Sequence, residues 1–297
     1  MTRMQRRRLG LAVTAALVGA MAVTSVAAAA DEMSATETAV TIPGADYDIV
    51  GTMALPADAE GAVPAVLMLH GYGSSADEVG DMYGRLADAL AAKGVGSLRI
   101  DFAGMGASPA STLDYTYDSM ISDAATALDW LVAQEAVDPD RIGVQGFSLG
   151  STIGAHLVGT DPRPIAFSSW SGAIYDGDPA VYEPQYEACE ATGEGHVVVD
   201  LGFRTLDHSC EYFSSMAAST ALTDFAPYAG SLLLVAGSED VDVDPSVSEN
   251  AATASASEDV TLEIVDGADH IYLVLTEDQT LADEVIGLTA DWFAEKL

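Results

Sequence analysis

The chain contains few basic residues for its length, and this scarcity limits the partners it can bind. Its 297 residues include 11 Lys and Arg against 46 Asp and Glu, a formal net charge of −35. Such a surface repels polyanions, so we expect neither nucleic acid nor an anionic membrane as a partner. Carboxylate-rich surfaces stay hydrated where salt screens their mutual repulsion. We therefore attribute the acidity to solubility in a saline environment and not to the chemistry of a site.

Cysteine is also scarce, because the chain contains only Cys189 and Cys210. No cysteine lies near the end of the N-terminal apolar run, which excludes a lipoprotein anchor. In an exported protein an isolated pair is bonded more often than free. We therefore predict a disulfide between the two cysteines. It would close a loop of about 20 residues and contribute on the order of 3 kcal/mol.

The first 30 residues have the pattern of a secretory signal peptide. Four arginines within the first eight residues precede an apolar run at 9–26, and alanines at 28–30 offer a small-residue cleavage site. The alternative is a membrane anchor. The apolar run is alanine-rich, weakly hydrophobic and without positive charges on its far side, which favours cleavage. We expect a secreted protein without a stable membrane anchor, in which residues 31–297 carry 7 basic and 46 acidic side chains, a net charge of −39.

Strand-like and helix-like segments alternate along most of the chain. Residues 38–42 and 47–55 predict an antiparallel hairpin. The continuous apolar run at 65–69 is expected for a strand buried on both faces, and further strands are predicted at 95–100, 165–169, 232–236 and 260–265. Helices are predicted between and after these strands, at 78–93, 118–135, 245–256 and 280–296. This order predicts one α/β domain over 31–297, with a mostly parallel sheet and helices on both of its faces. No internal repeat is visible.

Residues 171–215 interrupt the alternation. This segment contains both cysteines, many acidic residues, scattered glycines and six aromatic side chains: Tyr175, Tyr182, Tyr186, Phe203, Tyr212 and Phe213. A structureless loop of that length is uncommon inside a compact domain. We therefore expect a lid or an insertion here, whose aromatic side chains roof an apolar pocket.

The most informative motif is Gly-Phe-Ser-Leu-Gly at 146–150. A short strand pattern at 140–145 precedes it, and a helix-compatible run at 151–158 follows. This is the pattern of a nucleophile elbow, where a strand turns sharply into a helix and a strained serine occupies the corner. Glycines stand two residues before and after Ser148 because side chains there would collide with the neighbouring strand and helix. An ordinary glycine-rich turn is the alternative, and it explains neither flank.

A serine hydroxyl needs a base within hydrogen-bond reach, and a carboxylate must orient that base. After an elbow the expected chain order is serine, acid, histidine, each on a loop that follows a strand. Asp240 follows the run at 232–236, and His270 follows the run at 260–265. The other four histidines do not have such a position: His70, His156, His196 and His208.

The acid has competitors, because Glu239, Asp242 and Asp244 share the loop of Asp240. Asp240 is preferred by its distance from Gly237, and Asp242 stays an alternative. The alternation at 240–244 is similar to the start of a calcium-binding loop. It lacks the glycine at the sixth position and the glutamate at the twelfth, so we expect no metal.

A tetrahedral intermediate also needs donors for its oxyanion. The backbone N–H of Leu149, next to the predicted nucleophile, is one candidate. The second is the N–H of Tyr72 in His-Gly-Tyr-Gly at 70–73, where glycines let the backbone approach a carbonyl closely. The alternative for this second segment is a simple strand-to-helix turn.

Taken together, these motifs resemble the α/β-hydrolase superfamily. The resemblance extends from about residue 45 to the C-terminus and is carried by His-Gly-Tyr-Gly (70–73), Asp-Phe-Ala-Gly-Met-Gly-Ala-Ser (101–108), the elbow (146–150), Gly-Ser-Glu-Asp (237–240) and Gly-Ala-Asp-His (267–270). Within the superfamily the chain is most similar to the cinnamoyl/feruloyl esterase and serine-aminopeptidase-like branch. The edge of the expected lid, 200–213, shares that similarity.

The resemblance implies an α/β-hydrolase fold with an eight-stranded sheet and a lid insertion. It also implies a Ser148–Asp240–His270 triad, an oxyanion hole from the Tyr72 and Leu149 amides, and acyl-enzyme chemistry without a cofactor. The chain departs from the branch in two ways. The elbow has Phe147 and Leu149 where the branch often has His and Gln, and the insertion carries a cysteine pair. Substrate identity therefore does not transfer.

The sequence thus predicts a secreted serine hydrolase of carboxylic esters, either small molecules or polymer-attached. One alternative is an aminopeptidase-like serine peptidase, because acidic residues of the insertion could hold a substrate amine: Asp176, Asp178, Glu183 and Glu187. A second alternative is a non-catalytic binding protein with a hydrolase fold. Such proteins usually lack part of the triad, whereas this chain has all three residues. The sequence leaves the oligomeric state open.

Overall fold

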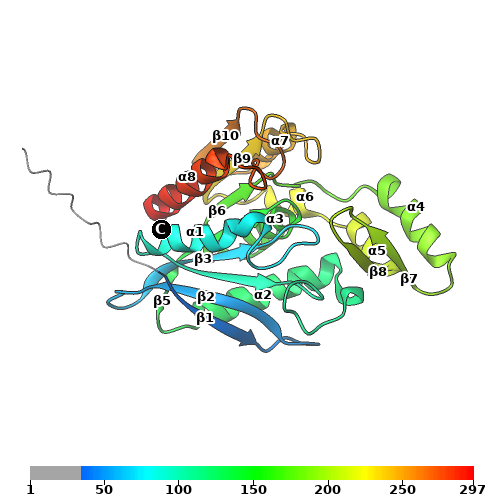
Figure 1. The fold of residues 1–297 in the computed structure, drawn as a ribbon, viewed down its shortest axis with the longest axis horizontal. Coiled ribbons are helices and arrows are strands. Elements are labelled where there is room, and N and C mark those ends of the chain that lie inside the picture. Colours follow the sequence, from blue (N-terminus) through cyan, green and yellow to red (C-terminus); the bar gives the residue numbers. More distant parts are fainter. Residues whose placement is uncertain (1–34) are drawn as a thin grey trace, which may run out of the picture. The chain divides into compact units, whose positions relative to one another are not determined.

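The structure is a computed structural model that describes residues 35–297 (Figure 1). The predicted signal peptide at 1–30 lies outside the described residues. The described strands are β1 (Ala35–Ile42), β2 (Ile49–Pro56), β3 (Val63–Leu69), β4 (Gly96–Asp101), β5 (Val137–Phe147), β6 (Pro164–Trp170), β7 (His196–Asp200), β8 (Thr205–Ser209), β9 (Ser231–Gly237) and β10 (Val260–Val265). The helices are α1 (Met82–Ala91), α2 (Tyr117–Val132), α3 (Leu149–Thr160), α4 (Pro179–Glu190), α5 (Cys210–Ala217), α6 (Ala221–Phe225), α7 (Ser246–Ala254) and α8 (Thr280–Lys296), with short 3-10 turns η1 (Val79–Asp81) and η2 (Thr112–Asp114).

Eight of these strands form one sheet in the order β1-β2-β4-β3-β5-β6-β9-β10. The pairs β1–β2 and β2–β4 are antiparallel, and all other neighbours are parallel. The predicted mostly parallel, eight-stranded sheet is confirmed. Strands β3 and β9 are short apolar runs because helices cover both of their faces.

Two layers of helices sandwich the sheet. Helices α1 and α8 pack side by side over one face, where their apolar residues contact alternate side chains of the strands (Figure 1). Helices α2, α3 and α7 bury their apolar residues on the other face. This arrangement agrees with the α/β architecture expected from the sequence, since each crossover between parallel strands carries a helix. No helix within residues 35–297 combines the length and hydrophobicity needed to cross a bilayer.

The connection between β6 and β9 is long and has structure of its own. Helix α4, the antiparallel hairpin β7–β8 and helix α5 follow one another within the segment predicted as an insertion (right side of Figure 1). We call residues 171–217 the cap segment. The disulfide Cys189–Cys210 joins the end of α4 to the start of α5, with 5.5 Å between the two Cα atoms. The sequence prediction of this bond is confirmed.

Parallel strands place their following loops at one edge of the sheet. The loops after β3, β5, β9 and β10 carry Tyr72, Ser148, Asp240 and His270, in that order. In open parallel sheets this carboxyl edge is where ligands bind. The fold therefore brings the residues singled out in the sequence to one edge.

Candidate active site

Ser148 occupies the sharp corner between β5 and α3. Its backbone has φ 51° and ψ −116°, a strained conformation for a residue with a side chain. A Cβ at Gly150 would lie 2.0 Å from the carbonyl oxygen of Leu69, and one at Gly146 would lie 2.5 Å from the Cα of Ser151. Both glycines are thus required by close backbone approach, as the sequence pattern predicted.

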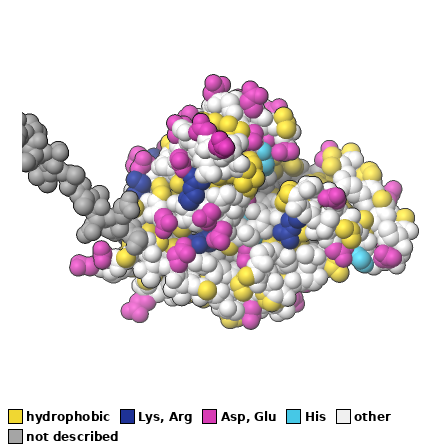
Figure 2. All heavy atoms as spheres, in the orientation of Figure 1, with side chains coloured by type: hydrophobic (Ala, Val, Ile, Leu, Met, Phe, Trp, Pro, Cys, Tyr) yellow, Lys and Arg dark blue, Asp and Glu magenta, His cyan; other side chains and the backbone are white. Residues whose placement is uncertain are grey.

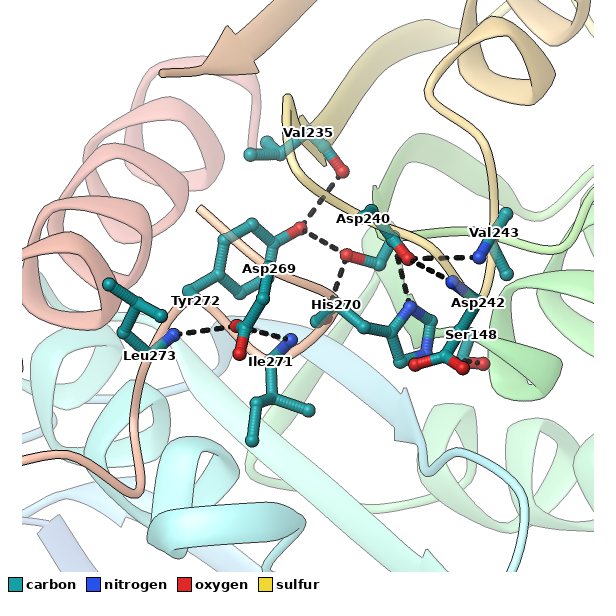
Figure 3. Close-up of polar contacts among 11 residues, drawn as sticks. Ser148, Val235, Asp240, Asp242, Val243, Asp269, His270, Ile271, Tyr272 and Leu273 are labelled. Atoms are coloured by element: carbon teal, nitrogen blue, oxygen red, sulfur yellow. Dashed lines mark hydrogen bonds and ion pairs between the residues drawn. The ribbon is translucent and has the colours of Figure 1, made fainter. Parts of the chain in front are cut away.

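A chain of hydrogen bonds links Ser148 to two further residues (Figure 3). The Nε2 atom of His270 lies 3.1 Å from the Oγ of Ser148, and its Nδ1 lies 2.8 Å from the Oδ2 of Asp240. A histidine in this position can take the hydroxyl proton at Nε2 while the carboxylate holds the proton at Nδ1. The structure brings the three residues together from loops separated by up to 122 positions in the sequence.

Asp240 is held by its own loop. Its Oδ1 accepts hydrogen bonds from the backbone N–H groups of Asp242 and Val243, each at 2.9 Å. Burial by itself raises the pKa of Asp240, but the hydrogen bonds from His270 and from these two amides outweigh it and hold the pKa below its usual value. The carboxylate facing His270 is therefore ionised at neutral pH. Asp242 contributes its amide, while its side chain is exposed.

The loop of His270 is fixed by residues that the sequence did not single out. The Oγ of Ser171 donates to the carbonyl oxygen of His270 at 2.9 Å, and the hydroxyl of Tyr272 donates to the carbonyl of Val235 at 3.0 Å. Asp269 accepts from the amides at 271 and 273 (Figure 3). No sequence signal identifies the bonds of Ser171 and Tyr272, since each joins residues far apart in the sequence.

The loop 70–74 after β3 is fixed by Glu78. The N–H of Gly71 donates to its Oε2 at 2.6 Å, and the hydroxyl of Ser74 donates to its Oε1 at 2.5 Å. Within residues 35–297 the N–H groups of Tyr72 and Leu149 donate to no other residue. One unpaired amide in the loop after β3 and one at the first residue of α3, next to Ser148, suit the stabilisation of an oxyanion.

His70, in the same loop, has a structural position. It is fully buried, its Nδ1 donates to the carbonyl of Gly71 at 2.8 Å, and its Nε2 accepts from the N–H of Phe102 at 3.2 Å. Burial lowers the pKa of His70, which agrees with a neutral ring that donates at one nitrogen and accepts at the other. His70 therefore joins the loops after β3 and β4.

His208 connects the cap segment to the same loop. Its Nε2 lies 2.5 Å from the hydroxyl oxygen of Tyr72, and its ring stacks on Tyr212 with 4.2 Å between centroids. Burial lowers the pKa of His208 to about 4, so the ring is neutral at pH 7. The other two histidines pair with carboxylates away from this contact, His156 with Asp224 and His196 with Asp207.

Ser148 and His270 open into a cavity of about 1010 Å³. Most of the aromatic side chains predicted to form a roof line it, together with Tyr72 and Phe147: Tyr175, Tyr182, Phe203, Tyr212 and Phe213. Tyr186 does not. The acidic residues proposed to hold a substrate amine do not line the cavity either, whereas Glu78 and Asp242 do. The cavity is therefore mainly aromatic and apolar, although acidic side chains dominate the charge on the face shown in Figure 2.

Asp240, Asp242 and His270 lie close enough together to be considered as ligands of a metal ion. Among the described residues, ligand atoms of Asp240, Asp242 and His270 lie within 4.8 Å of one another. The facing atoms of Asp240 and His270 are already hydrogen-bonded to each other, and an ion between them would break that bond. The donor set therefore suits proton transfer better than metal ligation.

Comparisons with known proteins agree with the observed fold. The family described as "alpha/beta hydrolase fold" matches residues 64–166, which include β3 and the elbow. The chain is 27% identical over 240 residues to the uncharacterized protein Rv2307c of Mycobacterium tuberculosis. The aligned region covers 80% of this chain and 73% of that protein.

Solved structures share the fold. Est1E from Butyrivibrio proteoclasticus, in a structure with ferulic acid bound, has a TM-score of 0.70 at 18% identity, covering 86% of this chain and 98% of that one. The esterase domain of a Rhodothermus marinus protein has a TM-score of 0.65 at 20% identity, covering 88% of this chain and 98% of that one. The sheet order, the elbow and these similarities together show that the chain has the α/β-hydrolase fold.

Proposed function

We propose that the protein is a secreted serine hydrolase that cleaves carboxylic esters through an acyl-enzyme. One observation carries the proposal: the hydrogen-bonded series Asp240–His270–Ser148, with spacings of 2.8 and 3.1 Å, ends at a strained elbow that opens into a cavity. Secretion is supported by the N-terminal sequence pattern and agrees with the disulfide.

In the proposed reaction, His270 takes the proton of Ser148 as its Oγ attacks the ester carbonyl. The negative charge that develops on the carbonyl oxygen is stabilised by the N–H groups of Tyr72 and Leu149. His270 then gives the proton to the leaving alcohol, which leaves an acyl group on Ser148. A water molecule repeats the attack with the same base and releases the acid. No step requires a cofactor.

The cavity lining supports an acyl or aryl ester as the substrate. Aromatic side chains of the cap segment offer flat apolar surface, which suits an aromatic or aliphatic group beside the scissile bond. The similarity to Est1E, whose structure contains ferulic acid, supports the feruloyl or cinnamoyl type within this class. Small-molecule and polymer-attached esters both present such groups.

The exposed carboxylate of Asp242 supports a second candidate, the aminopeptidase-like activity. It lines the cavity next to His270 and could hold an ammonium group. We prefer the ester because no acidic residue of the cap segment lines the cavity. Comparing 4-nitrophenyl butyrate with an aminoacyl 4-nitroanilide separates the two, since a peptidase would turn over the anilide.

Replacement of the nucleophile tests the proposal directly. We expect Ser148→Ala to lower the rate of 4-nitrophenyl butyrate hydrolysis by roughly 10³-fold or more and to abolish labelling by a fluorophosphonate probe. Ser214→Ala, which changes an exposed serine of α5, is the matched control and should retain both. Equal activity in wild type and Ser148→Ala, or an unlabelled wild type, would point to a non-catalytic binding protein.

A further inference from the structure

Nearly every basic side chain in residues 35–297 has a carboxylate partner. Six of them lie within 4.0 Å of an acidic oxygen: Arg85 with Asp283, Lys93 with Asp291, Arg99 with Glu37 and Asp77, Arg141 with Asp138, Arg163 with Asp129 and Asp161, and Lys296 with Asp259 and Glu295. Arg204 is the exception among the described residues. In a chain with 46 acidic side chains, an arginine without such a partner stands out.

Arg204 lies in the turn of the β7–β8 hairpin and lines the cavity that contains Ser148 and His270. Its Nη1 donates to the carbonyl oxygen of Gly73 at 2.8 Å, one residue beyond the amide proposed to hold the oxyanion. The guanidinium has five N–H donors, and within residues 35–297 this is the one hydrogen bond it makes. The Arg204 guanidinium is therefore held in place by Gly73, and its other N–H groups remain free to donate to a ligand.

The two acidic residues of the cavity lining do not neutralise Arg204. Glu78 is buried, and its two oxygens already accept from Gly71, Ser74 and the amide of Val79. Asp242 belongs to the group around His270 and makes no ion pair with Arg204. Arg204 thus lines the cavity, and among the described residues no carboxylate oxygen lies within 4.0 Å of its guanidinium.

We propose that Arg204 binds an ionised carboxylate of the substrate, so that the enzyme selects esters bearing a second, free carboxyl group away from the scissile bond. This inference rests on the proposed ester hydrolysis. The planar guanidinium matches a carboxylate with two parallel hydrogen bonds. In a protein whose overall charge repels anions, a local cation inside the cavity is what would hold such a substrate there.

The test compares matched substrates. One pair, 4-nitrophenyl butyrate and mono-4-nitrophenyl glutarate, differs by a carboxylate on the acyl side. The other, phenyl butyrate and 4-(butyryloxy)benzoate, differs by a carboxylate on the alcohol side. The quantity measured is the ratio of kcat/KM for the charged and neutral member of each pair, which cancels losses common to both.

Arg204→Gln removes the charge but keeps an N–H donor for the carbonyl of Gly73. We expect it to lower the ratio roughly 10- to 100-fold in at least one pair, since hydrogen bonds to charged groups have this strength. Arg204→Lys should lower it less. Arg141→Gln removes the same unit of charge at the partly exposed pair with Asp138, outside the cavity lining, and should leave the ratio unchanged.

A ratio equal to that of wild type in both pairs would overturn the inference and reduce Arg204 to an anchor of Gly73. Failure of wild type to hydrolyse any of the four esters is a different result, because it contradicts the proposed function itself. If Arg204→Gln does not fold, wild-type inhibition decides. Glutarate should then inhibit 4-nitrophenyl butyrate hydrolysis more strongly than glutaramide does, and equal inhibition would contradict the proposal.

Discussion

Asp240 and Asp242 stand two residues apart on one loop, yet their surroundings differ. The side chain of Asp240 is buried and faces His270, and it accepts three hydrogen bonds through its two oxygens. The side chain of Asp242 is exposed in the cavity. At the residue scale, hydrogen bonding therefore distinguishes two carboxylates that the sequence ranked only as a preferred acid and an alternative.

The difference predicts unequal effects on activity. Asp240→Asn should lower kcat for 4-nitrophenyl butyrate roughly 10³- to 10⁴-fold, because an amide cannot hold the proton of His270 Nδ1 in place as a carboxylate does. Asp242→Asn should lower kcat by at most about tenfold, since the backbone N–H at position 242 still donates to the carboxylate of Asp240. Steady-state kinetics checks both, with thermal melts to confirm folding. A larger loss in Asp242→Asn than in Asp240→Asn would reverse the assignment.

The candidate site could be predicted where it depends on strand-end position. Ser148, Asp240 and His270 each follow a strand, and parallel strands bring such loops together whatever the distance in sequence. The supporting contacts could not be predicted in this way. Glu78 meets Gly71 and His208 meets Tyr72 through side-chain geometry that no spacing rule encodes.

At the scale of elements, the central sheet followed from the alternation of short apolar runs with helical patterns. The sequence predicted an insertion at 171–215, but it did not predict the helices and hairpin of the cap segment, because the polar and aromatic residues there have no regular period. The Cys189–Cys210 bond joins two of its helices across the β7–β8 hairpin. A crosslink over 21 positions restricts the unfolded chain and stabilises the local structure.

The cap segment offers a direct probe of this effect, because Arg204 is its single trypsin site. We expect the double variant Cys189→Ser/Cys210→Ser to be cut after Arg204 roughly 10- to 100-fold faster than wild type, since about 3 kcal/mol of stabilisation is lost. Mass spectrometry of reduced digests measures the cleavage. The control is cleavage after Arg141, outside the cap segment. Equal acceleration at both sites would show global and not local loss of structure.

At the scale of the whole molecule, electrostatic repulsion opposes folding. Of the 46 acidic residues only Asp31 and Glu32 precede residue 35, so the described part carries 44 acidic and 7 basic side chains. Six of the seven basic groups are already paired, which leaves most carboxylates without a nearby cation. Dissolved salt must supply the screening that the protein lacks.

Stability should therefore rise with ionic strength. Between about 20 mM and 1 M NaCl at pH 7 we expect the Tm to increase by roughly 5 °C or more, because the screening length shortens to about 3 Å. Calorimetry near the sequence pI of about 4.1 is the control, since the net charge there is close to zero and the salt effect should shrink. A Tm that falls with NaCl at pH 7 would contradict this account.

The bonds between the hairpin and the loop after β3 also bear on how substrates enter. The hydroxyl oxygen of Tyr72 lies 2.5 Å from Nε2 of His208. The carbonyl oxygen of Gly73 accepts a hydrogen bond from Nη1 of Arg204 at 2.8 Å. If the β7–β8 hairpin moved outward, both hydrogen bonds would break. The backbone N–H of Tyr72, the proposed oxyanion donor, would then lose its alignment. We therefore expect the β7–β8 hairpin to keep its position while substrate enters the cavity and product leaves it.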